Sequence, residues 1–546
     1  MKRLYFAVIV FFLAVSVSSG QMAGDTESLT PSEANLFIKT KEISRLLKTV
    51  NYLVFNLMDE QQRGETIADR DKFRDKTGID YFDEQSIKNA GIDTGRPVSF
   101  ANFDKDNMND VMLVFLPVFN EKEFPLKFIE LVKKVNADNP EVKISPVTAK
   151  YRDVTVYQVK DDLFIAPSNG YLLIGSTSDI IRKSLDVRGA RGGSLILNEN
   201  YKDYLAKEKN KYDLNAFVTK SFIVQMMTPS GGNIQNSGLY SMENFIPAQV
   251  GQGGAEQSQG GALDSIDYIA AGMGLDGNKI QINASVKLTK DNPYVDMLLG
   301  FLKTGVQDKS LYIPSADSTV FTSFNLKYLD NFCKGDIEWC LKYNSFKQQV
   351  KTEYGIDIEK DFIPYHTGGL NVMALDSGAM GGMGDLLFFV PMTDAKKTEE
   401  LWLKLKRGFR TKYAKEKKFG EEKIGGNNGF WFIDESQMRF FVSFDKRGIY
   451  AGTSSSFMKS GMKSSSVETA VNTGRFGKVI NDKTFFLIDI KKNAFLKMMV
   501  QMRAQGNNDI AKGVNRIGEI LVYCEKRDGL ISVDFEVEMK EPAKKK

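Results

Sequence analysis

The chain has a single histidine, His366, so any Ser-His-Asp or Cys-His relay would have to use it. His366 lies between Tyr365 and Thr367-Gly368-Gly369, a pattern typical of a turn before a strand. One histidine and no C-x-x-C pair also argue against a zinc site. We therefore predict a turn residue rather than a base, and no catalytic or metal-binding residue.

Two short motifs match known chemistry but lack the context that it needs. Gly272-Met273-Gly274-Leu275-Asp276-Gly277 fits the dinucleotide pattern G-x-G-x-x-G, yet residues 278–288 alternate like a strand and not like the required helix. Ser456-Phe457-Met458-Lys459 fits the S-x-x-K of serine acyl enzymes, but the K-T-G sequences at 76–78 and 303–305 precede it. We predict a hairpin turn and a helix cap here, and no cofactor.

An acidic cluster comprises Asp104, Asp106, Asn107, Asn109 and Asp110. Hard cations need several converging oxygen ligands, but this spacing is not that of an EF-hand loop and no bidentate Glu ends it. We predict a solvated hairpin tip, and calcium is the one metal that stays open.

Cys333 and Cys340 are the candidate disulfide. In one continuous helix they would lie about 10 Å apart, too far for a bridge, whereas Gly335 could let the chain double back. A bridge and two small buried thiols both stay open. Cys524 lies in a strand pattern and is predicted to be packed.

The chain is rich in apolar side chains that adapt their shape, with 38 Phe and 21 Met. Met226-Met227 is one group, and Phe495, Met498, Met499 and Met502 form another at helical spacing. We interpret the second group first as a core face, and alternatively as the wall of an apolar pocket.

The N-terminus has the parts of a secretory signal peptide. Lys2 and Arg3 precede an apolar run over residues 4–17, and Ser18-Ser19-Gly20 offers small residues for cleavage. A membrane anchor is the alternative, but the run is short beside the roughly 20 residues of a bilayer span. We predict a signal peptide at 1–20, a loose segment at 21–40, an extracytoplasmic location, and no transmembrane segment in the mature chain.

Landmarks of the first half recur in the same order about 275 residues later, an offset far above the length of a solenoid repeat. Thr77-Gly78-Ile79-Asp80 matches Tyr354-Gly355-Ile356-Asp357, and Leu116-Pro117-Val118 matches Val390-Pro391-Met392. An amphipathic helix, paired short strands and a closing hairpin follow in both halves. The pattern indicates a domain duplication.

Many strand–turn–strand units mixed with helices favour an α+β fold. We predict two tandem diverged copies of one mixed domain, with largely antiparallel sheets and helices packed on one face. The first copy covers 41–305, with a Gly/Gln/Ser-rich loop at 230–261. The second covers 306–541, and a basic tail covers 542–546.

Composition fits a soluble globular protein, with 42% hydrophobic and 26% charged residues. The net charge is +4 and the two signs are interspersed, so we predict no nucleic-acid partner.

The second copy opens with Ile313-Pro314-Ser315-Ala316-Asp317-Ser318-Thr319, followed later by Gly355-Ile356-Asp357 and Val390-Pro391. It resembles an uncharacterised family of exported bacterial proteins, a domain of unknown function that opens with a Pro-Ala-Asp-Thr type strand. Here Ser315 separates Pro314 from Ala316, and the first copy lacks the opening motif. The resemblance implies an extracytoplasmic location and no catalytic residue.

We therefore expect an exported, non-enzymatic binding or structural protein of the bacterial cell envelope, with an envelope protein or an apolar ligand as partner. The alternative is a periplasmic carrier of a lipid or other apolar ligand, which needs a cavity lined by Phe, Met and Leu. A third hypothesis is an enzyme that uses carboxylates alone, for example on glycans. It needs two Asp or Glu about 5 to 10 Å apart in a cleft.

Overall fold

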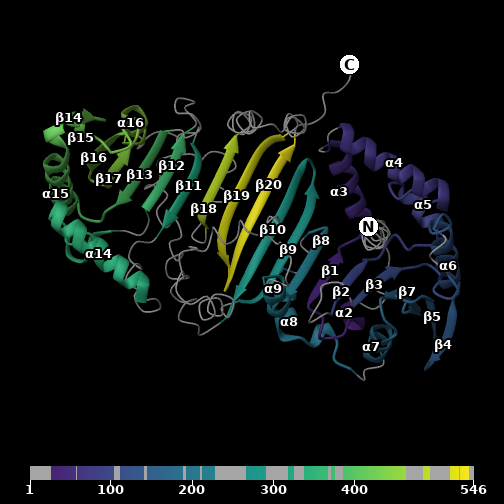
Figure 1. The fold of residues 1–546 in the computed structure, drawn as a ribbon. Helices are drawn as coiled ribbons and strands as arrows, with labels where there is room; N and C mark the ends of the chain where they lie inside the picture. The colour runs from purple at the N-terminus through teal and green to yellow at the C-terminus, as the bar shows by residue number, and fades with distance from the viewer. Residues whose placement is uncertain are drawn as a thin grey trace, which may run out of the picture. The chain divides into compact units, whose positions relative to one another are not determined.

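The computed structural model describes residues 26–56, 58, 60–103, 111–139, 144–188, 192–208, 212–227, 266–289, 318–324, 337–366, 370–375, 385–416, 418–462, 484–491, 517–527 and 529–539. They fall into two compact units (Figure 1), one up to Lys287 with Met539 and one from Leu288 to Glu538. Each unit is α+β with antiparallel strand pairs, as predicted. The predicted signal peptide, the 230–261 loop and the basic tail lie outside the described residues.

The strands of the first unit pair in the order β10–β9–β8–β1–β2–β3–β7–β6–β5–β4, antiparallel from β9 to β4. Their bounds are β1 Leu36–Thr40, β2 Ser99–Asn102, β3 Met112–Pro117, β4 Val147–Tyr151, β5 Val154–Lys160, β6 Leu163–Ser168, β7 Tyr171–Gly175, β8 Leu214–Thr219, β9 Ile266–Asp276 and β10 Lys279–Leu288.

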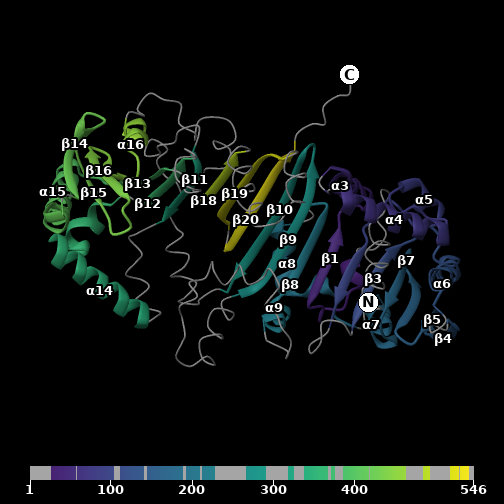
Figure 2. The same cartoon turned by 45° about the horizontal axis from the view of Figure 1, so that its top comes forward.

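The helices of the first unit lie on both faces of this sheet, and the prediction of helices on one face is corrected. They are α2 Thr26–Leu29, α3 Ile43–Asn56, α4 Glu60–Thr77, α5 Glu84–Asn89, α6 Phe124–Val135, α7 Ser178–Arg188, α8 Glu199–Glu208, α9 Lys220–Met227 and a 3₁₀ turn at Leu195–Leu197. In both views α4 and α7 lie on opposite sides of β3 and β7 (Figures 1 and 2).

Strand alternation explains why both faces are covered. Val114 of β3 packs in the same core cluster as Phe128 of α6, whereas its neighbour Leu113 is paired with Gly175, which lies against Ile180 of α7. Every residue of β7 is buried. Its uninterrupted apolar run, and not an alternating one, was the sequence signal for a strand covered on both faces.

The segment predicted to be loose at 21–40 is ordered over its described part, and that prediction is corrected. Residues 26–40 form α2 and β1, and β1 pairs with both β2 and β8 inside the sheet. Lys39 of β1 donates to both carboxylate oxygens of Glu27 in α2, at 2.7 and 2.8 Å. The polar composition of the segment does not indicate that these two residues form a buried ion pair.

The second unit pairs its strands in the order β20–β19–β18–β11–β12–β13–β17–β16–β15–β14. The strands are β11 Ser318–Phe324, β12 Leu370–Leu375, β13 Asp385–Pro391, β14 Phe419–Ile424, β15 Asn427–Ile433, β16 Arg439–Asp445, β17 Gly448–Gly452, β18 Thr484–Lys491, β19 Ile517–Arg527 and β20 Leu530–Met539. The helical elements are α14 Ile337–Tyr354, a π turn Ile358–Phe362, 3₁₀ turns Ile363–Tyr365 and Ala414–Glu416, α15 Ala395–Tyr413 and α16 Ser455–Met462.

The two units share their pairing order, and they also share register. Leu113 pairs with Gly175 and Pro117 with Tyr171 in the first unit. Leu387 pairs with Gly452 and Pro391 with Gly448 in the second. We call two residues, one from each unit, equivalent when they are the same number of residues along the chain from these paired positions. Common descent of the units stays a prediction.

Candidate functional site

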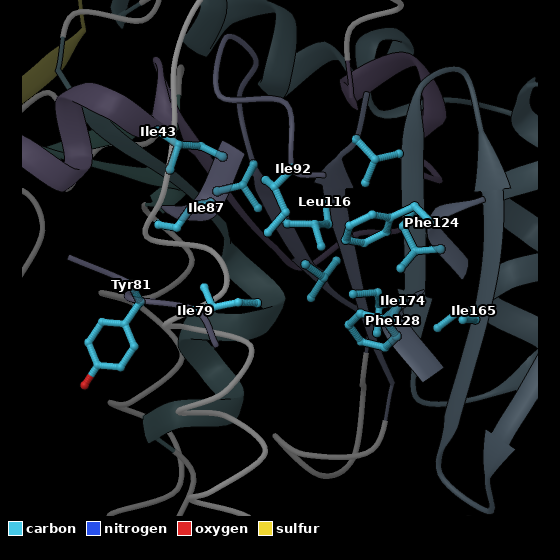
Figure 3. Packing of buried hydrophobic residues seen from close by; sticks show 14 of the residues in the cluster. Ile43, Ile79, Tyr81, Ile87, Ile92, Leu116, Phe124, Phe128, Ile165 and Ile174 are labelled. Carbon is cyan, nitrogen blue, oxygen red and sulfur yellow. The ribbon is translucent and has the colours of Figure 1, made fainter. Parts of the chain in front are cut away.

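A pocket of about 330 Å³ lies in the first unit, between the end of α4, helix α5 and helix α6. We call it the α4–α6 pocket. Its walls are apolar and polar in about equal parts, and Figure 3 shows Ile79, Ile92, Phe124 and Phe128 in the buried apolar cluster to which they belong. The lining residues are Thr77, Gly78, Ile79, Ser86, Asn89, Ala90, Ile92, Phe124, Lys127, Phe128 and Leu131.

The end of α4 forms one wall because the helix stops at a glycine. Gly78 has a φ of 78°, a conformation that favours glycine, and its N–H donates to the Arg74 carbonyl at 2.7 Å. The Thr77 hydroxyl donates to the Phe73 carbonyl at 2.7 Å and accepts from the Ile79 N–H at 3.1 Å. These bonds turn Ile79 into the core beneath the pocket.

Helix α5 begins at a capping residue, Asp83, whose carboxylate accepts from the N–H groups of Gln85 and Ser86. The Ser86 hydroxyl oxygen accepts from the Asp80 N–H at 2.8 Å. Asn89, the last residue of α5, is exposed, and its side-chain oxygen accepts from Gln85 Nε2 at 2.9 Å. With its oxygen engaged by Gln85, the Asn89 carboxamide has its two N–H groups left as donors.

Helix α6 supplies the opposite wall. Its apolar face buries Phe124 and Phe128, and Leu131 is half-buried beside them. A side chain at Gly91 would start 3.1 Å from the ring of Phe124, so glycine lets the α5–α6 connection pass this ring. Lys127 is exposed on the same helix and lines the pocket.

The basic side chains near the pocket differ in whether they are neutralised. Lys88 pairs with Glu84 at 2.9 Å, and Lys76 pairs with Asp138 at 2.5 Å. Among the acidic side chains that the structure describes, none forms an ion pair with Lys127. Lys127 is therefore the charged group that the pocket offers to a ligand.

The second unit fills the equivalent position with apolar side chains. Counted from the paired prolines, Lys127 is equivalent to Leu401, which is 5% exposed, and Phe128 is equivalent to Trp402. The turns ahead of the two helices support this alignment, because Asn120 Oδ1 accepts from Lys122 N–H just as the equivalent Asp394 Oδ1 accepts from Lys396 N–H. The fold therefore does not require a lysine at this place.

His366 is buried in the second unit. Its Nδ1 lies 3.1 Å from the Pro391 carbonyl oxygen, its ring stacks on Phe362 at 5.0 Å, and its backbone bridges to Met392. It follows the 3₁₀ turn Ile363–Tyr365, as the predicted turn residue should. Its contacts position the chain in the core, and it is equivalent to Ile92, which bridges to Val118.

The two rejected motifs have the structures predicted for them. The G-x-G-x-x-G sequence runs through β9 into the turn before β10, where Gly277 has a φ of 60°. The Ser454 hydroxyl oxygen accepts from the Phe457 N–H at 3.3 Å at the start of α16. The acidic cluster at 104–110 and the apolar group at 495–502 lie outside the described residues, and Met226 and Met227 end α9.

Of the two cysteines that the structure describes, one is disulfide-bonded and one is a free thiol. Cys340, in the first turn of α14, is disulfide-bonded, and Cys333, its predicted partner, lies outside the described residues. Cys524 is free and buried, and burial, together with the Asp534 carboxylate, raises its pKa to about 12. The Cys333–Cys340 bridge stays a prediction.

The described residues lack both a metal-binding cluster and a membrane-spanning helix. They contain no group of three His, Cys, Asp or Glu side chains placed to hold a metal ion. In the same part of the chain, no helix combines the length and the apolarity needed to cross a membrane.

Sequence reasoning missed the pocket because its residues come from three helices and most are neutral. The available signal was Lys127, a cation in the middle of the apolar pattern Phe124, Phe128, Leu131, where the second half has Leu401.

Comparison with known proteins gives little. No family model matches the chain, and no curated protein matches it. Solved structures of crystal forms I, III and IV of a protein named TP0453 match at TM-scores of 0.25, 0.26 and 0.24, with 9%, 9% and 10% identity. The matches cover 52%, 53% and 52% of this chain and 86%, 91% and 87% of those chains. Similarity at this level says nothing about the function of the chain.

Proposed function

We propose that the protein is an exported protein of the bacterial cell envelope that binds a ligand and carries out no reaction on it. The apolar part of that ligand occupies the α4–α6 pocket. The signal-peptide pattern of residues 1–20 supports the location. The pocket, which combines apolar side chains with a lysine that no described acidic side chain pairs, is the observation that carries the binding function.

The size of the pocket favours a small ligand. Its volume of about 330 Å³ is at the lower end of the range of about 300 to 1,000 Å³ for ligand pockets. One alkyl chain or a small aromatic ring system fits such a space, whereas a diacyl lipid does not. The carrier hypothesis is therefore supported only for a small apolar or amphiphilic molecule.

The expected affinity is modest. Burying about 200 Å² of apolar ligand surface contributes about 5 kcal/mol at 25 cal/mol per Å². Even without the cost of association, this corresponds to a dissociation constant of about 0.2 mM. The site therefore suits exchange of a ligand better than its permanent retention.

A blocking substitution tests this proposal. Asn89→Trp places a large side chain at the pocket rim without changing the core, because Asn89 is exposed. Lys134→Trp is the matched control, since Lys134 is exposed in the last turn of α6 and does not line the pocket. The readout is titration with the neutral fluorophore N-phenylnaphthylamine, and circular dichroism checks the fold of each variant.

We expect Asn89→Trp to weaken fluorophore binding by about tenfold or more, and Lys134→Trp to leave it within about twofold. Native mass spectrometry during the same titration adds a second readout, a mass increase of one fluorophore on the natural chain. No binding by the natural chain at millimolar fluorophore, or equal binding by Asn89→Trp, would overturn the proposal.

A further inference from the structure

The rim of the α4–α6 pocket presents hydrogen-bond donors. Lys127 brings an ammonium group, and the Asn89 carboxamide has its oxygen engaged by Gln85 and its N–H groups left to donate. The Ser86 hydroxyl oxygen accepts from Asp80 N–H, so the proton of that hydroxyl remains as a donor. No carboxylate is among the lining residues.

Such a rim is complementary to a group that only accepts hydrogen bonds and carries negative charge. A carboxylate has this character, because both its oxygens accept and neither donates. Its bonds to an ammonium and to neutral N–H donors are stronger than those of an uncharged acceptor. An alcohol or an amide would leave part of this donor set without a partner.

The charge of Lys127 is not explained by folding. The equivalent Leu401 of the second unit is buried on the helix that follows the equivalent strand, in the same register. Lys127 also lies in the first turn of α6, a turn with no acidic residue, where a cation is unfavourable to the helix dipole. A negatively charged ligand would pair with the Lys127 ammonium and would interact favourably with the positive end of the helix dipole.

We infer that the ligand of the α4–α6 pocket is a single-chain amphiphilic carboxylate. Its alkyl part packs on Phe124, Phe128 and Leu131, and its carboxylate accepts from Lys127 and Asn89. This inference rests on the proposed function, because it names the ligand class of the same pocket. The second unit, with leucine at the equivalent place, does not share this preference.

The test compares two molecules that differ in the head group alone, octanoate and octanol. Each is titrated against the pocket by displacement of N-phenylnaphthylamine. The variants are Lys127→Gln and a matched control, Lys134→Gln, which removes an exposed lysine from the last turn of α6 that does not line the pocket.

We expect the natural chain to bind octanoate about tenfold more tightly than octanol. Lys127→Gln abolishes this difference by weakening octanoate and leaves octanol within about twofold, whereas Lys134→Gln changes neither. Raising the salt concentration to about 0.5 M weakens octanoate alone, because screening acts on the charge pair.

Different outcomes would overturn the carboxylate inference and the proposed function. If octanoate and octanol bind equally and Lys127→Gln has no effect, the carboxylate inference is wrong and the pocket remains the ligand site. If neither molecule displaces the fluorophore, or the fluorophore itself does not bind, the proposed function fails and the inference fails with it.

Discussion

Removing the cation of the buried ion pair between α2 and β1 should uncouple the N-terminal segment from the first unit. Glu27 is 1% exposed and Lys39 is 7% exposed. Lys39 Nζ donates to both carboxylate oxygens, and the Tyr201 hydroxyl donates to one of them at 3.2 Å. Lys39→Met keeps the length of the side chain and removes its charge, so that the Glu27 carboxylate stays buried without a cation.

The expected loss of stability is large. Breaking a buried pair by removing one partner costs about 3 to 5 kcal/mol, since the remaining charge is uncompensated. Domains are commonly stable by only about 5 to 15 kcal/mol. Adding Glu27→Gln to Lys39→Met should recover part of the loss, because a neutral carboxamide is less costly to bury and still accepts from Tyr201.

Hydrogen exchange measured by mass spectrometry reads this change in the first unit. A loss of 3 to 5 kcal/mol speeds exchange of the β1 and β8 amides by about a hundredfold to several thousandfold. The second unit provides an internal control, because Trp339, Trp402 and Trp431, the only tryptophans of the chain, all belong to it. Tryptophan fluorescence during urea unfolding should therefore be unchanged.

Unchanged exchange in β1 and β8 of Lys39→Met would refute this reasoning, and the segment would then be loosely attached despite its contacts. A double variant no more stable than Lys39→Met would refute the part that assigns the loss to the uncompensated carboxylate.

The remaining predictions concern glycines and cysteines. A Cβ at Gly175 would lie 2.8 Å from Ile180, and one at Gly452 would lie 2.6 Å from the Leu386 carbonyl oxygen. Gly175→Ala and Gly452→Ala should each cost about 1 to 3 kcal/mol in urea unfolding, whereas Gly64→Ala, in open space on α4, should gain about 0.5 to 1 kcal/mol. Equal stability of all three variants would contradict the close packing at β7 and β17. Because the pKa of Cys524 is raised to about 12, this thiol should resist iodoacetamide at pH 8 in the folded protein. The thiol's contribution to stability is full below pH 9, its ordinary pKa, and is lost as the pH rises toward 12, because the unfolded thiol ionises first. In urea without reductant, intact-mass labelling should find one alkylated cysteine, and three after reduction, whereas three labels before reduction would exclude the predicted Cys333–Cys340 bridge.

Local turn chemistry made part of the fold predictable. The Gly-Ile-Asp sequences at 78–80 and 355–357 mark helix ends in both units, where Gly78 and Gly355 have positive φ. The apolar runs that end in Pro117 and Pro391 are β3 and β13. These features depend on neighbours in sequence, so a sequence is enough to find them.

Features that depend on distant contacts were not predictable in this way. The sequence of residues 26–40 looks loose because it does not show that Glu27 pairs with Lys39 of the next element. Strand β2, which pairs with β1, is also far along the chain. The pocket combines Thr77, Asn89 and Lys127, which the sequence does not bring together. Only the packing of α4, α5 and α6 defines that site.

The shared register of the two units has a consequence for saturation mutagenesis. Each structural position of the sheet is present twice in one molecule, so a scan of all substitutions measures it twice under identical conditions. Positions constrained by folding, such as Gly175 and Gly452, should give correlated tolerance profiles. Lys127, where we propose a ligand contact, and the equivalent core residue Leu401 should give different profiles, and the scan would thereby separate architectural residues from functional ones.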